Sequence, residues 1–264
     1  MAVLLTLLLC AVPASSAAMG QSEKYAEPST QEMWALLLER DYPAAYLDTL
    51  VPPQLAGLYK LAREKDAHFY ALAESGESGV RGRISAERLA LSLVLSYTPV
   101  EYEGDIYFSE GYLTVHYCWR EPPVVRGSDS ISVSWDPELW QYGGDGDFTA
   151  QDLFRHPASS RWEVYETWEQ PQSITRGGVK ISTDLGSGAY LDGGLMWSYS
   201  TGLAGTVQIS LLPEEMLSIQ AAPGQMTGVG AVYIHGKTPL GLGLGWFPRE
   251  SAAVECDVPY RRAE

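Results

Sequence analysis

Apolar and polar residues alternate most clearly in residues 112 to 137. The alternating apolar positions form two arms: Leu113, Val115, Tyr117 and Trp119, then Ile131, Val133 and Trp135. A period of two places such side chains on one face of a pleated strand. Pro122, Pro123 and Gly127 lie between the arms and favour a corner over a continued strand. The stretch therefore predicts two strands of a two-layer β core.

Comparable strand patterns recur through the rest of the chain after residue 83. We expect further strands at residues 89–97, 162–168, 179–183, 195–199, 207–211, 231–235 and 253–258. Glycine, proline, aspartate and serine separate these runs, which is typical of antiparallel sheets rather than of strands that alternate with helices. The pattern predicts a mainly β fold, an antiparallel β-sandwich with jelly-roll or immunoglobulin-like connections.

Residues 29–73 show a different period, with apolar residues three or four positions apart. Ser29 and Glu32 have the spacing of a capping box, and Pro43 and Pro52 suit the starts of further short helices. We interpret these helices as a cap over an open sheet edge, with a partner-binding arm as the alternative. The glycine-rich residues 74–82 predict a boundary. The expected units are a signal peptide at 1–18, a helical cap and linker at 19–82, and a β-sandwich domain at 83–264.

The first residues of the chain are typical of an export signal. Residues 2–12 form an apolar run that is too short to span a bilayer, and Ser16 and Ala18 fit cleavage after residue 18. We therefore expect a secreted or cell-surface protein without a stable membrane span after cleavage. A buried N-terminal element is the alternative. No Lys or Arg precedes the apolar run, so a truncated start stays open.

Charge and cysteine content narrow the classes of partner. The 33 acidic and 18 basic residues give a formal net charge of −15, which repels nucleic acid and anionic lipid. After signal removal Cys118 and Cys256 remain, and they are compatible with one disulfide or with two buried thiols.

Several motifs of the chain after residue 18 occur in one order. They are Tyr42-Pro43, Leu47-Asp48, Leu50, Leu58-Tyr59, Trp119, Pro123-Val124-Val125-Arg126-Gly127-Ser128-Asp129-Ser130-Ile131, Trp135-Asp136, Gly177-Gly178 and His235-Gly236-Lys237-Thr238-Pro239. In these motifs the chain resembles a loosely defined group of uncharacterised exported proteins from Gram-positive gut bacteria. The resemblance implies export and a β fold, and it brings no activity or catalytic residues.

The sequence contains no recognisable catalytic or metal-binding signature. It has neither a Gly-x-Ser-x-Gly nor a His-Glu-x-x-His motif, and its four histidines lack ligand spacing. We therefore assign no catalytic residue, no metal ligand and no cofactor. Asp145 and Asp147 have the alternating oxygen spacing of a calcium loop, although an acidic surface loop is the default interpretation.

Two groups of residues are candidates for binding or structural roles. Trp140 and Tyr142 lie beside the acidic loop, and Trp162 and Trp168 are predicted to share one face of a strand. Exposed rings of this kind bind glycans or proteins. Buried core is the alternative for these aromatic residues. Arg126 and Asp129 are expected to tie the predicted corner by a charged hydrogen bond, or Asp129 to bond a nearby backbone group.

These observations favour an exported, non-catalytic β-sandwich protein that binds glycan or protein at the cell surface. The alternatives are a secreted glycoside hydrolase with a pair of carboxylates across a groove and a structural assembly subunit. An exposed apolar strand edge within residues 224–247 would favour the assembly subunit.

Overall fold

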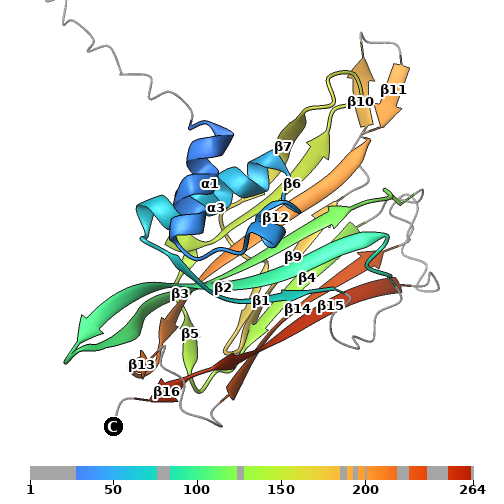
Figure 1. Cartoon of the computed structure of the whole chain (residues 1–264). Helices are drawn as coiled ribbons and strands as arrows, with labels where there is room; N and C mark the ends of the chain where they lie inside the picture. The colour runs from blue at the N-terminus through green and yellow to red at the C-terminus, as the bar shows by residue number, and fades with distance from the viewer. Residues whose placement is uncertain are drawn as a thin grey trace, which may run out of the picture.

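A computed structural model describes residues 28–75, 84–123, 128–184, 189–192, 196–199, 201–218, 226–236 and 249–262. Antiparallel sheets make up most of this part of the chain, and the α-helices precede the sheets in sequence (Figure 1). The mainly β prediction is therefore confirmed.

The helices begin where the sequence places their caps. Within the described residues they are α1 (Thr30–Glu39), α2 (Ala44–Leu47) and α3 (Pro52–Glu64). The Ser29 hydroxyl accepts a hydrogen bond from the Glu32 backbone N–H at 3.2 Å, and the Glu32 carboxylate accepts one from the Ser29 N–H at 2.7 Å. Pro43 caps α2 and Pro52 opens α3. The capping-box prediction is confirmed.

The larger sheet, called here the first sheet, has its main strands in the order β1-β2-β3-β12-β6-β7. Their bounds are β1 (His68–Glu74), β2 (Leu89–Tyr102), β3 (Asp105–Trp119), β12 (Gly202–Pro213), β6 (Thr149–Arg155) and β7 (Trp162–Trp168). Short strands extend it at β5 (Trp140–Tyr142), β13 (Leu217–Ser218) and β16 (Arg261–Arg262).

The second sheet has the strand order β15-β14-β4-β9-β8. Its strands are β15 (Arg249–Pro259), β14 (Met226–Gly236), β4 (Ser128–Trp135), β9 (Gly178–Asp184) and β8 (Ser173–Thr175). A separate hairpin of β10 (Ala189–Asp192) and β11 (Met196–Tyr199) projects beyond both sheets at the upper right of Figure 1.

The two sheets share one hydrophobic cluster, and the helices form a second cluster on the other face of the first sheet. Leu113, Val115, Tyr117 and Trp119 belong to the cluster between the sheets, as do Ile131, Val133 and Trp135. Tyr112, which alternates with these residues on β3, packs with the helices instead. Trp119 and Trp135, the tryptophans of the two predicted core strands, are only 2% and 4% exposed.

Two sequence expectations need correction. The helical region was expected to reach residue 73, but α3 ends at Glu64, Asp66 has a positive φ of 51°, and residues 68–74 pair with β2 as a strand. Finally, β14 lies between β15 and β4, so its described residues form no free strand edge.

Candidate functional site

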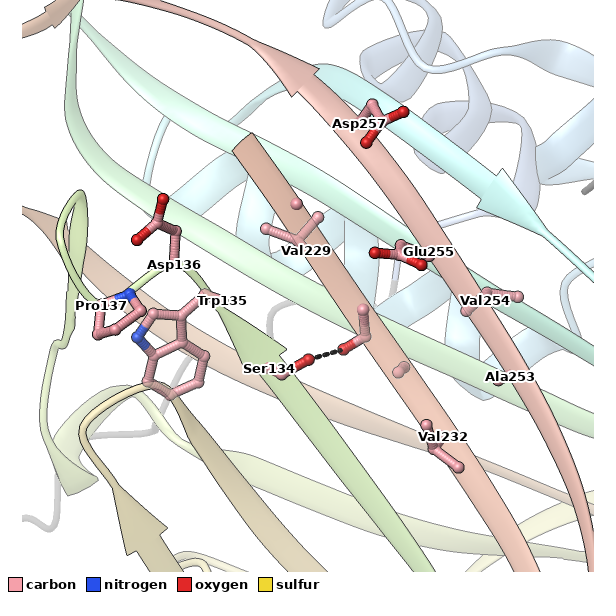
Figure 2. Close-up of a pocket in the computed structure, with 13 residues that line it drawn as sticks. Ser134, Trp135, Asp136, Pro137, Val229, Val232, Ala253, Val254, Glu255 and Asp257 are labelled. Carbon is pink, nitrogen blue, oxygen red and sulfur yellow. Dashed lines mark hydrogen bonds between the residues drawn. The ribbon is translucent and has the colours of Figure 1, made fainter. Parts of the chain in front are cut away.

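The candidate site is a groove of about 920 Å³ across the second sheet, on the face that points away from the first sheet. Strands β4, β14 and β15 form its floor, and the turn after β4 closes one end (Figure 2). Side chains of Val229, Ala231 and Val254 alternate with the groove residues and are buried in the core between the sheets. The inner residues of the same strands thus fix the floor of the groove.

No side chain rises above the sheet in the middle of the groove floor, because glycines occupy these positions. Gly228 pairs with Asp257, and Gly230 pairs with Glu255 on one side and with Ser134 on the other. A glycine has no side chain above the sheet, so the neighbouring side chains form walls around an open floor. The Ser134 hydroxyl donates a hydrogen bond to the Gly230 carbonyl at 3.4 Å, as Figure 2 shows.

Acidic side chains dominate the electrostatics of this groove. Glu255 and Asp257 are two residues apart on β15, and both are exposed. Asp136, at the end of β4, is half-buried and accepts a hydrogen bond from the Glu138 backbone N–H at 2.9 Å. No Lys or Arg occurs among the described residues that line the groove. The groove therefore presents negative charge to whatever enters it.

The aromatic residues proposed as a binding strip do not form one surface. Trp140 is 1% exposed and packs edge to face on Phe108, with a ring-centroid distance of 5.4 Å. Gly111 leaves the space for this ring, because a Cβ there would lie 3.0 Å from it. Tyr142 is half-buried against the core between the sheets. The exposed binding role predicted for Trp140 is therefore wrong.

A β-bulge separates the other two tryptophans. On β7, Val164 pairs with Leu153 but Glu166 pairs with Asp152, so Tyr165 is an extra residue in the strand. One extra residue reverses the faces of all residues beyond it. Trp168 consequently packs on the core between the sheets, whereas Trp162 lies on the opposite face over Gly202. The prediction that Trp162 and Trp168 share a face is wrong.

The hydrogen-bond partners of Asp129 in the structure lie on β14, far from the corner where the sequence predicted them. It is 1% exposed and accepts hydrogen bonds from the Tyr233 hydroxyl, from His235 Nδ1 at 2.8 Å and from the Gly236 backbone N–H at 3.1 Å. Tyr233 also accepts a bond from Trp119 Nε1 at 3.1 Å. Arg126 lies outside the described residues. Asp129 therefore connects β4 to the end of β14, and the centre of the fold is not purely apolar.

A second buried acid lies on the first sheet, facing the same core. Asp152 accepts a hydrogen bond from the Tyr117 hydroxyl, and the Tyr117 and Tyr233 rings are 5.0 Å apart. Burial raises the pKa of both tyrosines well above their ordinary value, so both hydroxyls stay protonated as donors. We name this group, Asp129, Asp152, Tyr117, Tyr233 and His235 with Trp119, the inter-sheet polar cluster.

The remaining candidates have ordinary partners. Asp147 forms an ion pair with Lys65 at 2.7 Å, and the Asp145 side chain lies outside the described residues. No set of three or more His, Cys, Asp or Glu in the described ranges is arranged to hold a metal ion. Cys118 and Cys256 are free thiols, and burial raises the pKa of each. None of the described helices has the length and apolar character needed to cross a membrane.

Comparisons with known proteins add little to this geometry. No protein-family model and no curated protein matches the chain. A solved structure described as "AvmM Catalyzes Macrocyclization in Alchivemycin A Biosynthesis" shares 15% identity and a TM-score of 0.24 with it, over 64% of this chain and 98% of that chain. A TM-score this low supports no conclusion about fold or function.

Reasoning from the sequence missed the groove, although one signal for it was present. The segment Gly228-Val229-Gly230-Ala231-Val232 alternates glycine with apolar residues, and Glu255 alternates with Val254 and Cys256. A strand that places glycine on its outer face and apolar side chains on its inner face marks a position where a ligand or another chain can approach the backbone. The pairing of Gly230 with Glu255 was needed to recognise the acidic wall.

Proposed function

We propose that the chain is an exported, non-catalytic binding protein whose groove receives an extended, positively charged segment of another protein. The observation that carries this proposal is the open glycine floor of Gly228 and Gly230 bordered by the exposed carboxylates Glu255 and Asp257. Opposite charges across an interface increase association rate and specificity. The net charge of −15 adds attraction for a basic partner at longer range.

A protein ligand fits the groove better than a glycan. Carbohydrate recognition relies on exposed aromatic rings, but Trp140 is buried, and Trp162 and Trp168 lie on opposite faces of β7. The groove offers instead one exposed apolar side chain, Val232, together with carboxylates and backbone. A hydrolase with a carboxylate pair has less support, because two of the three groove carboxylates, Glu255 and Asp257, are exposed side by side on one strand.

The architecture and location form part of the same proposal. We infer that the two sheets form a β-sandwich, which is supported by the cluster of buried residues they share. Export rests on the apolar residues 2–12 and on the resemblance to exported proteins. Secretion assays with and without residues 1–18 test this part separately from binding.

The binding test uses two peptides of matched length, one rich in lysine and arginine and one in which glutamate replaces these residues. Isothermal titration of the full chain should show binding of the basic peptide alone, weakening as salt screens the charges. The double variant Glu255→Gln, Asp257→Asn should weaken binding at least about tenfold. The matched control Glu163→Gln, Glu166→Gln removes two exposed acids of β7 on the first sheet and should leave binding unchanged.

Two results would refute the proposed ligand. One is basic-peptide binding that is the same in the groove variant and in the β7 control. The other is a glycan that binds the full chain in an array and does not bind the groove variant, which would show that the groove binds carbohydrate.

A further inference from the structure

A second, smaller pocket of about 210 Å³ lies between the helices and the first sheet. Its polar lining includes Thr49, Ser75, Ser92, His116, Cys118 and Arg120. Thr49 and Arg120 are exposed and mark the mouth, whereas Ser92 and His116 are only 8% and 3% exposed and form the floor. The pocket is on a different sheet from the acidic groove.

Strand pairing builds the floor of this pocket from two rows of side chains. Ser92 on β2 pairs with His116 on β3, and Ala90 pairs with Cys118 in the next row. These positions alternate with core residues such as Tyr117, so their side chains stand on the helix side of the sheet. Directly paired residues have Cβ atoms about 4.5–5.5 Å apart, so one ligand group can reach both Ser92 and His116. Ala90 contributes only a methyl group, which leaves space beside them.

One buried nitrogen on the floor lacks a hydrogen-bond partner. The Tyr46 hydroxyl lies 2.5 Å from His116 Nδ1, while Nε2 is buried and has no partner within the described part of the chain. A buried polar group without a partner destabilises the folded chain. A ligand that forms a hydrogen bond with Nε2 therefore removes this penalty when it binds.

The floor carries no charge at neutral pH. Burial lowers the pKa of His116 to about 3 and raises the pKa of the Cys118 thiol, so both side chains are neutral. Glu74 borders the pocket beside Ser92, but it already interacts with another group of the chain and is not available to balance a charge on a ligand. Because a buried charge needs a compensating charge, the ligand group that reaches the floor is expected to be neutral.

The other polar groups around the pocket require a ligand that both donates and accepts hydrogen bonds. The hydroxyls of Thr49 and Ser75 each donate to a backbone carbonyl, at 2.7 and 3.4 Å, and each oxygen keeps a lone pair that can accept. Arg120 offers only donors, and His116 Nε2 is a donor in one ring tautomer and an acceptor in the other. A hydroxyl group satisfies all of these positions, whereas a carboxylate only accepts and an ammonium only donates.

The size of the pocket limits the ligand further. Pockets for drug-sized molecules span about 300–1,000 Å³, so this pocket holds a smaller molecule. Its volume is that of about seven waters at about 30 Å³ each, which is roughly the volume of one sugar ring. We propose that the pocket binds a neutral monosaccharide, with one hydroxyl hydrogen-bonded to Ser92 and His116 Nε2 on the floor and the remaining hydroxyls toward the mouth. This site is independent of the proposed groove function.

Titration of the ¹⁵N-labelled full chain, followed by NMR, tests the ligand class. The probes are D-glucose, D-galactose, D-mannose and D-ribose. The controls are acetate with a negative charge, glycinamide with a positive charge, and cyclohexanol with a single hydroxyl on a ring of similar size. We expect at least one sugar to bind saturably and each control to bind at least about tenfold more weakly than that sugar.

Two results of this titration overturn the proposal. One is the absence of binding by all of these sugars at about 10 mM, because a ligand with a Kd of about 1 mM would nearly saturate the site. The other is a control that binds as tightly as the best sugar.

The imidazole nitrogens report where the sugar binds. The bound sugar should shift the His116 Nε2 resonance and leave the resonances of His156, which lies outside the pocket, unchanged. Saturable sugar binding without a change at His116 Nε2 would refute this pocket.

Variants test the location independently. Ala90→Leu should fill the space beside Ser92 and His116 and weaken sugar binding at least about tenfold, and Ser92→Ala should weaken it less. Ala56→Leu is the matched control, because Ala56 is exposed on α3. Thermal unfolding shows whether each variant is folded. Equal sugar binding by wild type and folded Ala90→Leu refutes this pocket, and if Ala90→Leu does not fold, the His116 Nε2 resonance of the wild type decides.

The groove variant separates this proposal from the proposed function. The double variant Glu255→Gln, Asp257→Asn should bind the sugar as the wild type does, because the groove lies on the other sheet. Sugar binding that is lost in this variant and kept in Ala90→Leu would refute the pocket.

Discussion

Two buried groups, each with a tyrosine and a histidine, lie on opposite faces of the first sheet, and their hydrogen bonds differ. Between the sheets, the Asp129 carboxylate accepts hydrogen bonds from Tyr233, His235 and the Gly236 backbone. Under the helices, Tyr46 and His116 contact each other without a carboxylate, and His116 Nε2 is left beside a pocket. The Asp129 carboxylate, which accepts from three donors, holds β4 and β14 together. The neutral pair of Tyr46 and His116 leaves His116 Nε2 able to form a hydrogen bond with a ligand.

The largest loss of stability is expected when the carboxylate of Asp129, the shared acceptor between the sheets, is removed. Asp129→Ala leaves the Tyr233 hydroxyl, His235 and the Gly236 N–H without it, and should lower the free energy of unfolding by about 3–5 kcal/mol. Urea denaturation at pH 7 measures the loss. Asp129→Asn, which keeps one acceptor oxygen, should lose less, and the exposed Glu163→Ala should change stability by less than about 0.5 kcal/mol. A loss equal to that of Glu163→Ala would show that the cluster is not structural.

The second prediction concerns the space around Tyr117, the tyrosine of the inter-sheet polar cluster on β3. A Cβ added at Gly205 would lie 2.3 Å from the Tyr117 ring and hydroxyl. Gly205→Ala should therefore destabilise the fold by about 1–3 kcal/mol, because the ring must leave its place beside Asp152. Gly57→Ala is the matched control, since nothing lies within 4 Å of its Cβ in α3, and it should stabilise by about 0.5–1 kcal/mol. A change of the melting temperature in the same direction for both variants would contradict the packing argument.

The third prediction concerns the pH dependence of stability that the buried His116 ring causes on the helix side of the sheet. Burial lowers the pKa of His116 to about 3, whereas histidine in an unfolded chain has a pKa near 6.5. Between these values the unfolded chain binds a proton that the folded chain excludes, so stability falls as the pH falls. From pH 7 to pH 5 this contribution is about 2 kcal/mol. His116→Asn should lack it, so the stability difference between wild type and variant should change by this amount in urea titrations at the two pH values. Parallel pH dependence would contradict the buried neutral ring.

The smallest expected effect concerns the attachment of the helices to the sheet. Gln54 is 2% exposed, and its Nε2 donates hydrogen bonds to the Tyr117 carbonyl at 3.1 Å and to the Gly205 carbonyl at 2.8 Å. Gln54→Met keeps the volume but loses both of these bonds and the bond that Gln54 Oε1 accepts from the Val51 backbone N–H at 3.1 Å. The variant should cost about 1–2 kcal/mol in the free energy of unfolding. Amide hydrogen exchange should be faster in α3 and unchanged in β4. Faster exchange in both elements would indicate a global rather than a local loss.

Several features of the candidate sites were predictable from sequence, but their partners were not. The importance of Asp129 at the end of the Pro122–Pro123 corner was anticipated, yet its partners lie more than one hundred residues away. His116 was treated as one of four scattered histidines, because its polar neighbours Ser92 and Glu74 reach it only through strand pairing. Trp140 was misplaced because a short strand before a glycine-rich acidic loop has the same local pattern whether it is buried or exposed.

The sequence by itself determined the period-two faces of β2 and β3, the capping box of α1 and the proline-started helices. Each of these depends on residues a few positions apart, where local sterics and hydrogen bonds decide the outcome. Only the tertiary structure decided that residues 68–74 form a strand, that a bulge at Tyr165 separates Trp162 from Trp168, and that Gly230 faces Glu255. These outcomes depend on the register between distant strands, and a shift of one residue moves every side chain beyond it to the other face of the sheet.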